Sequence, residues 1–235
     1  MVDWNDNTVK LIVYLVYGTS FVAMFLALTF WRKRVSHIEL MNDFRYLAIF
    51  GLLNGLAEYS DIPRFLAWQP AWIYDIIKLF LVSSSFAALF AFGLNVVSAG
   101  IEERRWLRGI PHGALLMYFW LILFMGLDIV SGNGTGIKYS SAELAMRYSL
   151  GFLGAAATSY AFFELSGKVN TIAGENAGKK FIYAGVGFAL YAIFGGINVN
   201  PILGVPAVAF RSVIAVMITI FVIMLFRLFE VKKPG

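Results

Sequence analysis

Seven long apolar segments place the strongest constraint on what this chain can fold into. They lie roughly at residues 8–31, 44–60, 72–99, 110–130, 143–165, 181–199 and 207–229. An apolar stretch of about 20 residues is long enough to cross the hydrocarbon core of a bilayer as an α-helix. Backbone polar groups in lipid must be paired internally, which also favours helices. The sequence therefore predicts an all-α membrane protein, with one domain over residues 1–235 that is a seven-transmembrane helix bundle.

The composition agrees with this interpretation. Of the 235 residues, 60% are hydrophobic and 14% are charged, whereas soluble domains are about half apolar and about a quarter charged. The connections between the apolar segments are short, so we expect no folded soluble domain among them. The chain has no cysteine, which excludes disulfides, thiolate metal sites and cysteine nucleophiles.

The basic residues predict the orientation in the membrane. They concentrate in alternate connections and at the C-terminus: Arg32, Lys33, Arg34 and Arg45, then Arg104, Arg105 and Arg108, then Lys168, Lys179 and Lys180, and finally Arg227, Lys232 and Lys233. By the positive-inside rule, these segments are cytoplasmic, so the N-terminus is outside and the C-terminus is cytoplasmic. The isoelectric point near 9.4 thus reflects topology, and we expect no nucleic-acid partner.

Ionisable residues near or within the apolar segments gather on one side of the membrane. With the predicted orientation, the following fall in the outer half of the bilayer or at its edge: Glu58, Asp61, Arg64, Asp75, Lys78, Asp128, Glu143, Arg147 and Arg211. A charge at the bilayer centre costs about 2.5–3.5 kcal/mol on insertion scales, so such groups normally pair with one another or face a cavity. This one-sided placement indicates a candidate site.

The spacing of these residues predicts which of them share a helix face. Asn54, Glu58 and Asp61 are separated by four and three residues, which places them on one face of the second helix. Glu143 and Arg147 are four residues apart, a spacing that allows a local ion pair.

We expect the second, fifth and seventh helices to meet at their outer ends. Glu58 or Asp61 would then lie within ion-pair reach of Arg147 or Arg211. Two interpretations remain open. The charges can form a closed network that fixes the bundle, or they can rim a pocket open to the outer leaflet, in which two guanidinium groups hold a carboxylate, a phosphate or a quinone-like oxygen.

Pairs of glycines predict close contacts between helices. Gly51 and Gly55 form a G-x-x-x-G pair on the second helix, and Gly151 and Gly154 lie on the fifth. Small residues at this spacing let helix backbones approach each other in membranes. We interpret these glycines as packing features.

Catalytic motifs are absent from the sequence. The two histidines, His37 and His112, lie near the cytoplasmic border without partners at helical spacing, which excludes a di-haem pair or a histidine-box iron site. The last apolar segment has no lysine, which excludes a retinal Schiff base there. No Walker loop, Ser-His-Asp arrangement or H-E-x-x-H motif is present. We therefore predict no enzymatic activity, no metal site and no cofactor.

Three stretches resemble a known family. "LAIFGLLNGLAEYSDI", "MRYSLGFLGAA" and "GVPAVAFRSVIAVMITIFVIMLFRLFEV" resemble the N-terminal membrane region of certain bacterial sensor histidine kinases and diguanylate cyclases. The family carries G-L-x-H-G-x-x-E-W-x-D on its second helix, R-Y-x-x-G-x-x-G on its fifth, and G-x-P-x-x-x-x-R before its seventh. The matching residues are Gly51, Gly55, Glu58, Asp61, Arg147, Tyr148, Gly151, Gly154, Gly204, Pro206 and Arg211.

The resemblance implies a sensory domain of the bacterial cytoplasmic membrane. A lipid or quinone-like ligand would bind between helices near the outer leaflet, at Asn54, Glu58, Asp61, Arg147, Tyr148 and Arg211. Helix seven would then pass a conformational change through Phe229 and Glu230 to a cytoplasmic kinase or cyclase output domain, or to a partner protein, as in two-component signalling. A homodimer is compatible with this arrangement. Asn54 stands where the family usually has histidine, and Tyr59 where it has tryptophan, so a ligand that depends on that histidine would bind here differently.

Two other function classes remain open from the residues alone. A small transporter or channel could use the outer charges as a substrate vestibule, although the inner half offers few polar residues beyond Thr158 and Ser159. A lipid-modifying enzyme could use Glu58 or Asp61 as acid or base, but the chain lacks the histidines and metal ligands that would support it.

Overall fold

The computed structural model describes residues 4, 6–34, 40–66, 71–99, 102–131, 139–173, 175–197 and 205–230. The fold is all-α. Its elements are α1 (Asn7–Arg34), α2 (Leu40–Tyr59), α3 (Ile62–Phe65), α4 (Ala71–Ser98), the 3₁₀ helix η1 (Glu102–Gly109), α5 (Ile110–Ser131), α6 (Tyr139–Met146), the π-helical η2 (Arg147–Phe152), α7 (Leu153–Ala173), α8 (Glu175–Tyr191), the π-helical η3 (Ala192–Gly196) and α9 (Ala207–Glu230).

The seven predicted segments correspond to seven long helical segments in the described residues. Five of these segments are formed by one helix each, namely α1, α2, α4, α5 and α9. The other two are the continuous runs α6–η2–α7 and α8–η3. The fifth segment is longer than predicted, at 139–173 instead of 143–165, and the sixth begins at residue 175 instead of 181. Hydropathy marks only the apolar part of a helix, whereas the polar turns at these ends continue the same backbone hydrogen bonding.

Four helices of the described chain are long and apolar enough to cross a membrane. These spans are Asn7–Trp31, Trp72–Ser98, Trp106–Met125 and Ala207–Leu225, which belong to α1, α4, α5 with the end of η1, and α9. Many large apolar side chains on them are exposed, including Phe30, Phe80 and Phe124. Apolar surface on this scale is typical of contact with lipid. These four spans indicate a multi-pass membrane protein.

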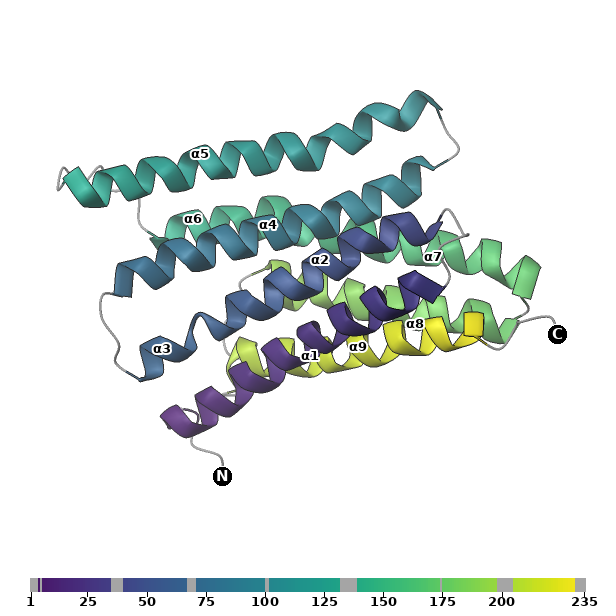
Figure 1. Ribbon diagram of the computed structural model, residues 1–235, viewed down its shortest axis with the longest axis horizontal. Coiled ribbons are helices and arrows are strands. Elements are labelled where there is room, and N and C mark those ends of the chain that lie inside the picture. The colour runs from purple at the N-terminus through teal and green to yellow at the C-terminus, as the bar shows by residue number, and fades with distance from the viewer. Residues whose placement is uncertain are drawn as a thin grey trace.

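The helices run along the long axis of the molecule (Figure 1). The contacts between them close six of the described helices into a ring. Going round the ring, α1 packs against α2, α2 against α4, α4 against α7, α7 against α8, α8 against α9, and α9 against α1. α5 lies outside the ring at one edge and packs against α4 (Figure 1). The interior of the ring is therefore shared by six helices, whereas α5 has one main helical neighbour.

Aromatic rings fill the interior of the ring. Phe21 and Phe50 lie edge to face with their centroids 5.1 Å apart, which joins α1 to α2. Phe162 and Phe188 stack at 5.5 Å and join α7 to α8. Tilted and edge-to-face ring pairs are the favoured geometries for buried aromatics. The core is consequently held by shape-specific contacts between helices that are distant in sequence.

The contact of α1 with α2 depends on glycine, as predicted. A Cβ atom on Gly55 would lie 2.8 Å from the carbonyl oxygen of Gly18, and one on Gly51 would lie 2.8 Å from the carbonyl oxygen of Phe21. Neither position has room for a side chain unless the backbones separate. Gly151 and Gly154 meet Phe86 of α4 in a similar way. The interpretation of both glycine pairs as packing features is confirmed.

Candidate functional site: a buried charge cluster

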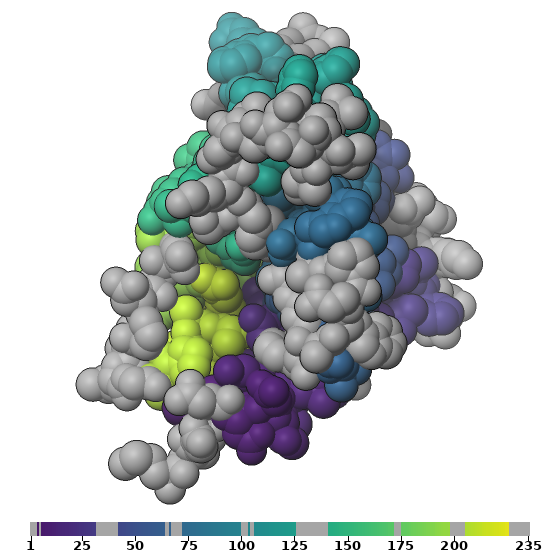
Figure 2. Space-filling view, turned by 90° about the vertical axis from the view of Figure 1, so that its left-hand side faces the viewer, coloured from purple at the N-terminus to yellow at the C-terminus, as the bar shows by residue number. Residues whose placement is uncertain are grey.

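Charged and polar side chains gather at one end of the bundle, which we call the N-terminal end. There α1, α4, α6 and α9 begin and α2 ends. Figure 2 looks onto this end and shows the start of α1 beside the start of α9. The charge cluster consists of Asn54, Glu58, Asp61, Lys78, Glu143, Arg147 and Arg211. Asn54, Glu58, Asp61, Lys78 and Arg147 are all less than a tenth exposed.

One ion pair joins α4 to the turn that follows α2. Lys78 Nζ lies 2.5 Å from Asp61 Oδ2, and the two side chains are 9% and 4% exposed. The sequence pattern does not predict this pair. Lys78 reaches Asp61 because α2 and α4 are neighbours in the ring. That Arg147 or Arg211 lies within ion-pair reach of Glu58 or Asp61 stays a prediction.

A second ion pair is local to the helix that contains η2. Arg147 Nη2 lies 2.7 Å from Glu143 Oε1, and Arg147 Nε donates to the same oxygen at 3.0 Å. This is the pair that the spacing of four residues predicted, and it is confirmed. The Arg147 side chain is only 8% exposed, so the pairing matches its charge in a buried position.

Both arginines converge on the C-terminal end of the α8–η3 helix. Arg147 Nη1 donates to the carbonyl of Gly195 at 2.9 Å, and Arg211 Nε donates to the carbonyl of Phe194 at 2.5 Å. The last carbonyl groups of a helix have no intrahelical partner and carry the negative end of its dipole. The two guanidinium groups therefore cap this helix end. The expected convergence of the two arginines occurs, on backbone carbonyls.

The carboxylate of Glu58 has no direct partner among the residues that the structure describes. It is 5% exposed, and in the part of the chain that the structure describes no hydrogen bond or ion pair involves its carboxylate. The charges that act on it electrostatically are, in decreasing order, Lys78, Asp61, Arg147 and Arg211. A buried carboxylate normally has hydrogen-bond or ion-pair partners, since burying it alone is costly. Glu58 is therefore an available acceptor inside the bundle.

Asn54 supplies an available donor one turn away. Its Oδ1 atom accepts from Ser85 Oγ and from the Tyr191 hydroxyl, each at 3.4 Å, and the Tyr191 hydroxyl lies 3.3 Å from that of Tyr17. Its Nδ2 atom is buried and has no hydrogen-bond partner. An unsatisfied buried donor costs about 1–3 kcal/mol. The amide thus links α1, α2, α4 and α8 while leaving one donor open.

The charges of the cluster balance among the described residues. Three carboxylates belong to it, and they face three cations from α4, η2 and α9. Two of the carboxylates take part in ion pairs. The uncommitted groups are the Glu58 carboxylate and the Asn54 amide nitrogen, which lie on the same face of α2.

The other predicted site residues lie apart from this cluster. Tyr148 is 45% exposed, since it follows the inward-facing Arg147 and lies on the opposite side of η2. Phe229 and Glu230 belong to the backbone of α9, but their side chains lie outside the described residues, as do those of Arg64 and Asp128.

Sequence reasoning missed part of the cluster. Ser85, Tyr17 and Tyr191 carry its hydroxyl groups, yet each lies within an apolar segment and reads there as an ordinary core residue. The sequence places Lys78 among the outer charges but does not predict its pairing with Asp61. Its spacing of 17 residues from Asp61 indicates nothing until the α2–α4 contact is known.

Comparisons with known proteins do not assign this cluster to a family. Neither the protein-family models, nor the curated proteins, nor the solved structures include a match to this chain. The functional interpretation accordingly rests on the geometry of the cluster and on the pattern of the sequence.

Proposed function

We propose that the chain is a membrane-embedded sensory domain. All seven long helical segments cross the bacterial cytoplasmic membrane, with the N-terminus outside and the C-terminus in the cytoplasm. The alternating basic segments of the sequence support this orientation. The closed ring supports seven crossings because α2, α7 and α8 lie between helices that are apolar enough to span.

The single observation that carries the proposal is the pair of uncommitted groups on α2. The reduced, quinol form of a quinone-like molecule, or a lipid headgroup with hydroxyl groups, would accept a hydrogen bond from Asn54 Nδ2 and donate one to Glu58. Both residues are buried, at 1% and 5% exposed, so the ligand enters only when α2 separates from a neighbour. A ligand that prefers this separated state shifts the equilibrium toward it.

The output of the domain passes through α9. Glu58 lies in the field of Arg147 and Arg211, and both arginines hold the π-helical end of the α8–η3 helix. Movement at α2 therefore alters the forces on the first turns of α9. The helix runs from there to Glu230 at the opposite end, where Phe229 and Glu230 would meet a cytoplasmic kinase or cyclase module or a partner protein. Small shifts of packed helices are a known form of such transmission.

The transporter alternative has weaker support. Thr158 Oγ1 donates to the carbonyl of Leu89 at 2.9 Å, and Ser159 Oγ donates to that of Gly185 at 2.8 Å. These two hydroxyl groups serve helix packing and do not continue the polar cluster across the membrane. Measuring the flux of charged solutes into proteoliposomes distinguishes the two classes: flux would favour transport, and tight vesicles favour the sensor.

Thermal unfolding of the purified protein tests ligand binding. We expect the melting temperature to rise with an added short-chain ubiquinol analogue or with a bacterial lipid extract, because a ligand that binds only the folded state stabilises it by mass action. Asn54→Leu should abolish the shift. It removes an unsatisfied donor but also the acceptor of Ser85 Oγ and of the Tyr191 hydroxyl, so the shift is measured against the variant's own melting temperature without ligand.

Tyr148→Phe is the matched control, since it changes an exposed hydroxyl next to Arg147 and should keep the shift. The proposed ligand site is wrong if neither probe shifts the wild type, or if the shift persists in Asn54→Leu.

A further inference from the structure

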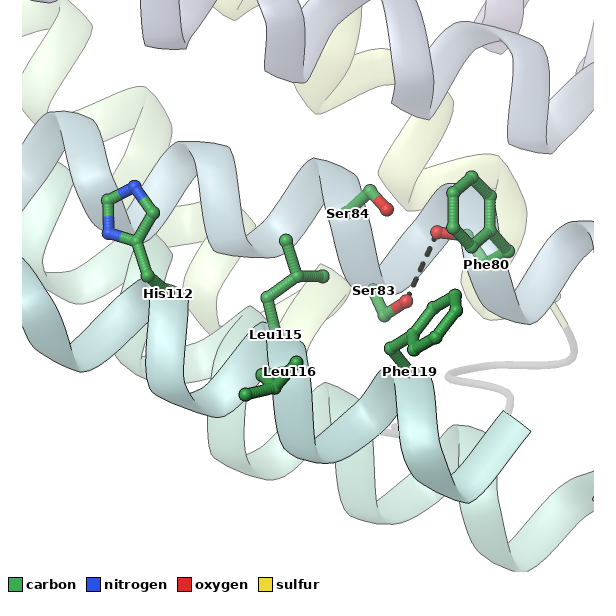
Figure 3. Close-up of a pocket in the computed structure, with 7 residues that line it drawn as sticks. All are labelled: Phe80, Ser83, Ser84, His112, Leu115, Leu116 and Phe119. Atoms are coloured by element: carbon green, nitrogen blue, oxygen red, sulfur yellow. Dashed lines mark hydrogen bonds between the residues drawn. The ribbon is translucent and has the colours of Figure 1, made fainter. Parts of the chain in front are cut away.

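Two adjoining grooves follow the contact between α4 and α5. The first has a volume of about 280 Å³ and is lined on its apolar side by Phe80, Leu115, Leu116 and Phe119 (Figure 3). The second, of about 200 Å³, extends toward α2. Ser84, His112 and Leu115 line both. The grooves follow this contact because α5 lies outside the ring and packs mainly against α4.

Basic side chains mark the end of these grooves nearest the start of α5. His112 points from α5 toward α4 (Figure 3), and its Nδ1 donates to the carbonyl of Arg108 at 3.0 Å, which leaves Nε2 available. Arg108 is exposed, and its Nε donates to Ser98 Oγ at 2.8 Å. This bond anchors the guanidinium at the end of α4 and leaves its terminal nitrogens free to bind an anion.

A further cation lies on the α2 side of the second groove. The Arg45 guanidinium lies 4.7 Å above the ring of Tyr46, which lines that groove, and Arg45 donates to the Tyr46 hydroxyl at 3.0 Å. Two carboxylates of the described side chains lie in this region. Asp43 accepts from Asn95 Nδ2 at 3.3 Å and lies in the field of both arginines, and Glu103 is exposed on η1. Two arginines and a histidine thus outnumber these two carboxylates among the described side chains.

We propose that these grooves bind one phospholipid with an anionic headgroup, in the leaflet that borders η1. The phosphate lies against Arg108, His112 and Arg45, and an acyl chain follows Leu115 and Phe119. Basic pockets between membrane helices favour anionic headgroups. An acyl chain gains little by moving from bilayer to groove, because both surroundings are apolar. Selectivity therefore comes from the headgroup, and the site distinguishes anionic from zwitterionic lipid.

A third groove shows what the basic end adds. It lies between α1 and α9, has a volume of about 400 Å³, and is lined by residues such as Leu15, Val16 and Ile220, with no charged residue among its described lining. Size alone would favour lipid there. We expect it to hold phospholipids without regard to headgroup charge.

The test compares two lipids that differ only in headgroup. The full chain is titrated in detergent with phosphatidylglycerol and with phosphatidylcholine of identical acyl chains, and bound lipid is counted by native mass spectrometry. We expect phosphatidylglycerol to bind at least tenfold more tightly. Arg108→Gln with His112→Gln should remove that preference, since each basic contact contributes about fivefold. Arg108→Lys keeps the charge and should retain most of it.

Lys179→Gln is the matched control, because Lys179 is an exposed cation at the same end of the bundle but lies in α8, outside the grooves. It should leave the preference unchanged. Equal binding of the two lipids by the wild type would overturn the proposal, and so would an equal loss in Lys179→Gln and in the double variant. Unchanged melting temperatures confirm that each variant is folded. This test is independent of Asn54 and Glu58, so its outcome does not decide the proposed sensory function.

Discussion

Arg211 near the start of α9 donates a hydrogen bond from Nε to the backbone carbonyl of Phe194, 2.5 Å away in the last turn of the α8–η3 helix. The contact joins two helices across the residues between 197 and 205, and it uses a carbonyl that its own helix cannot pair. Arg211 is therefore a bond between helices as well as a charge, which sets the expected result of its replacement.

Arg211→Met should lower the free energy of unfolding by about 1–3 kcal/mol, because it leaves a half-buried carbonyl without a donor. Arg211→Lys should restore part of this loss. Reversible unfolding in mixed micelles measures both variants. Lys168→Met is the control, since Lys168 forms an exposed pair with Glu164 and should change stability by no more than about 0.5 kcal/mol. Equal effects at the two positions would show that the Phe194 contact contributes nothing.

The buried pair of Lys78 and Asp61 should show strong coupling. Replacing the carboxylate, as in Asp61→Asn, leaves the buried Lys78 ammonium without its ion-pair partner and should cost about 3–5 kcal/mol, whereas Asp61→Asn with Lys78→Met should recover most of that loss. A double-mutant cycle on unfolding free energies measures the coupling. The exposed pair of Lys179 and Glu175 provides the comparison and should couple by about 0.3–0.5 kcal/mol. Similar coupling energies for both pairs would contradict the interpretation that burial strengthens the first.

Alanine at two glycines should have effects of opposite sign. Gly55→Ala places a Cβ 2.8 Å from the carbonyl of Gly18 and should destabilise the protein by about 1–3 kcal/mol through overpacking. Gly167→Ala in α7 meets nothing within 4 Å and should stabilise it by about 0.5–1 kcal/mol, because alanine is the better helix residue. Melting curves of the two variants are sufficient. A neutral Gly55→Ala would mean that α1 and α2 separate easily.

Cysteine labelling should establish the proposed orientation. The chain has no native cysteine, so Ser141→Cys in α6 and Asn176→Cys in α8 each provide a single thiol at an exposed position. A membrane-impermeant maleimide should label residue 141 in intact spheroplasts and residue 176 only after permeabilisation. Labelling in the reverse order would invert the orientation, and equal labelling would refute an odd number of crossings between the two sites.

Much of the fold could be predicted from the sequence, because a local apolar segment indicates each long helix. The local pair of Glu143 and Arg147 and the glycine contact of α1 with α2 were equally accessible, since both depend on spacing within one helix. The ring order was not. Which helix faces Asp61 depends on contacts between segments far apart in sequence. The pair of Lys78 with Asp61 therefore could not be predicted from the sequence.

The charged residues of the candidate site were predictable from the sequence, but which of its polar groups have no hydrogen-bond partner was not. Asn54 and Glu58 share a buried face of α2, as their spacing predicted. The prediction that Asp61 continues this helix face is wrong, because α2 ends at Tyr59 and Asp61 is buried in the turn before α3. That Asn54 has an open donor and Glu58 an open acceptor depends on how Ser85, Lys78 and the two arginines are already engaged. Tyr148 shows that a residue adjacent to a site residue need not belong to the site, because successive residues of a helix point in different directions. Arg147 is buried, whereas Tyr148 is exposed.

The four strongly apolar spans have a consequence for how the protein is made. α1, α4, α5 and α9 can each enter the bilayer as independent segments. In the seven-span arrangement, α2 enters beside α1, and α7 and α8 enter as a hairpin before α9 closes the ring. Lys78 and Asp61 meet only once α2 and α4 are both in place. The buried pair therefore depends on the insertion of both helices, and removal of α9 should leave the faces of α1 and α8 that pack against it without a helical neighbour.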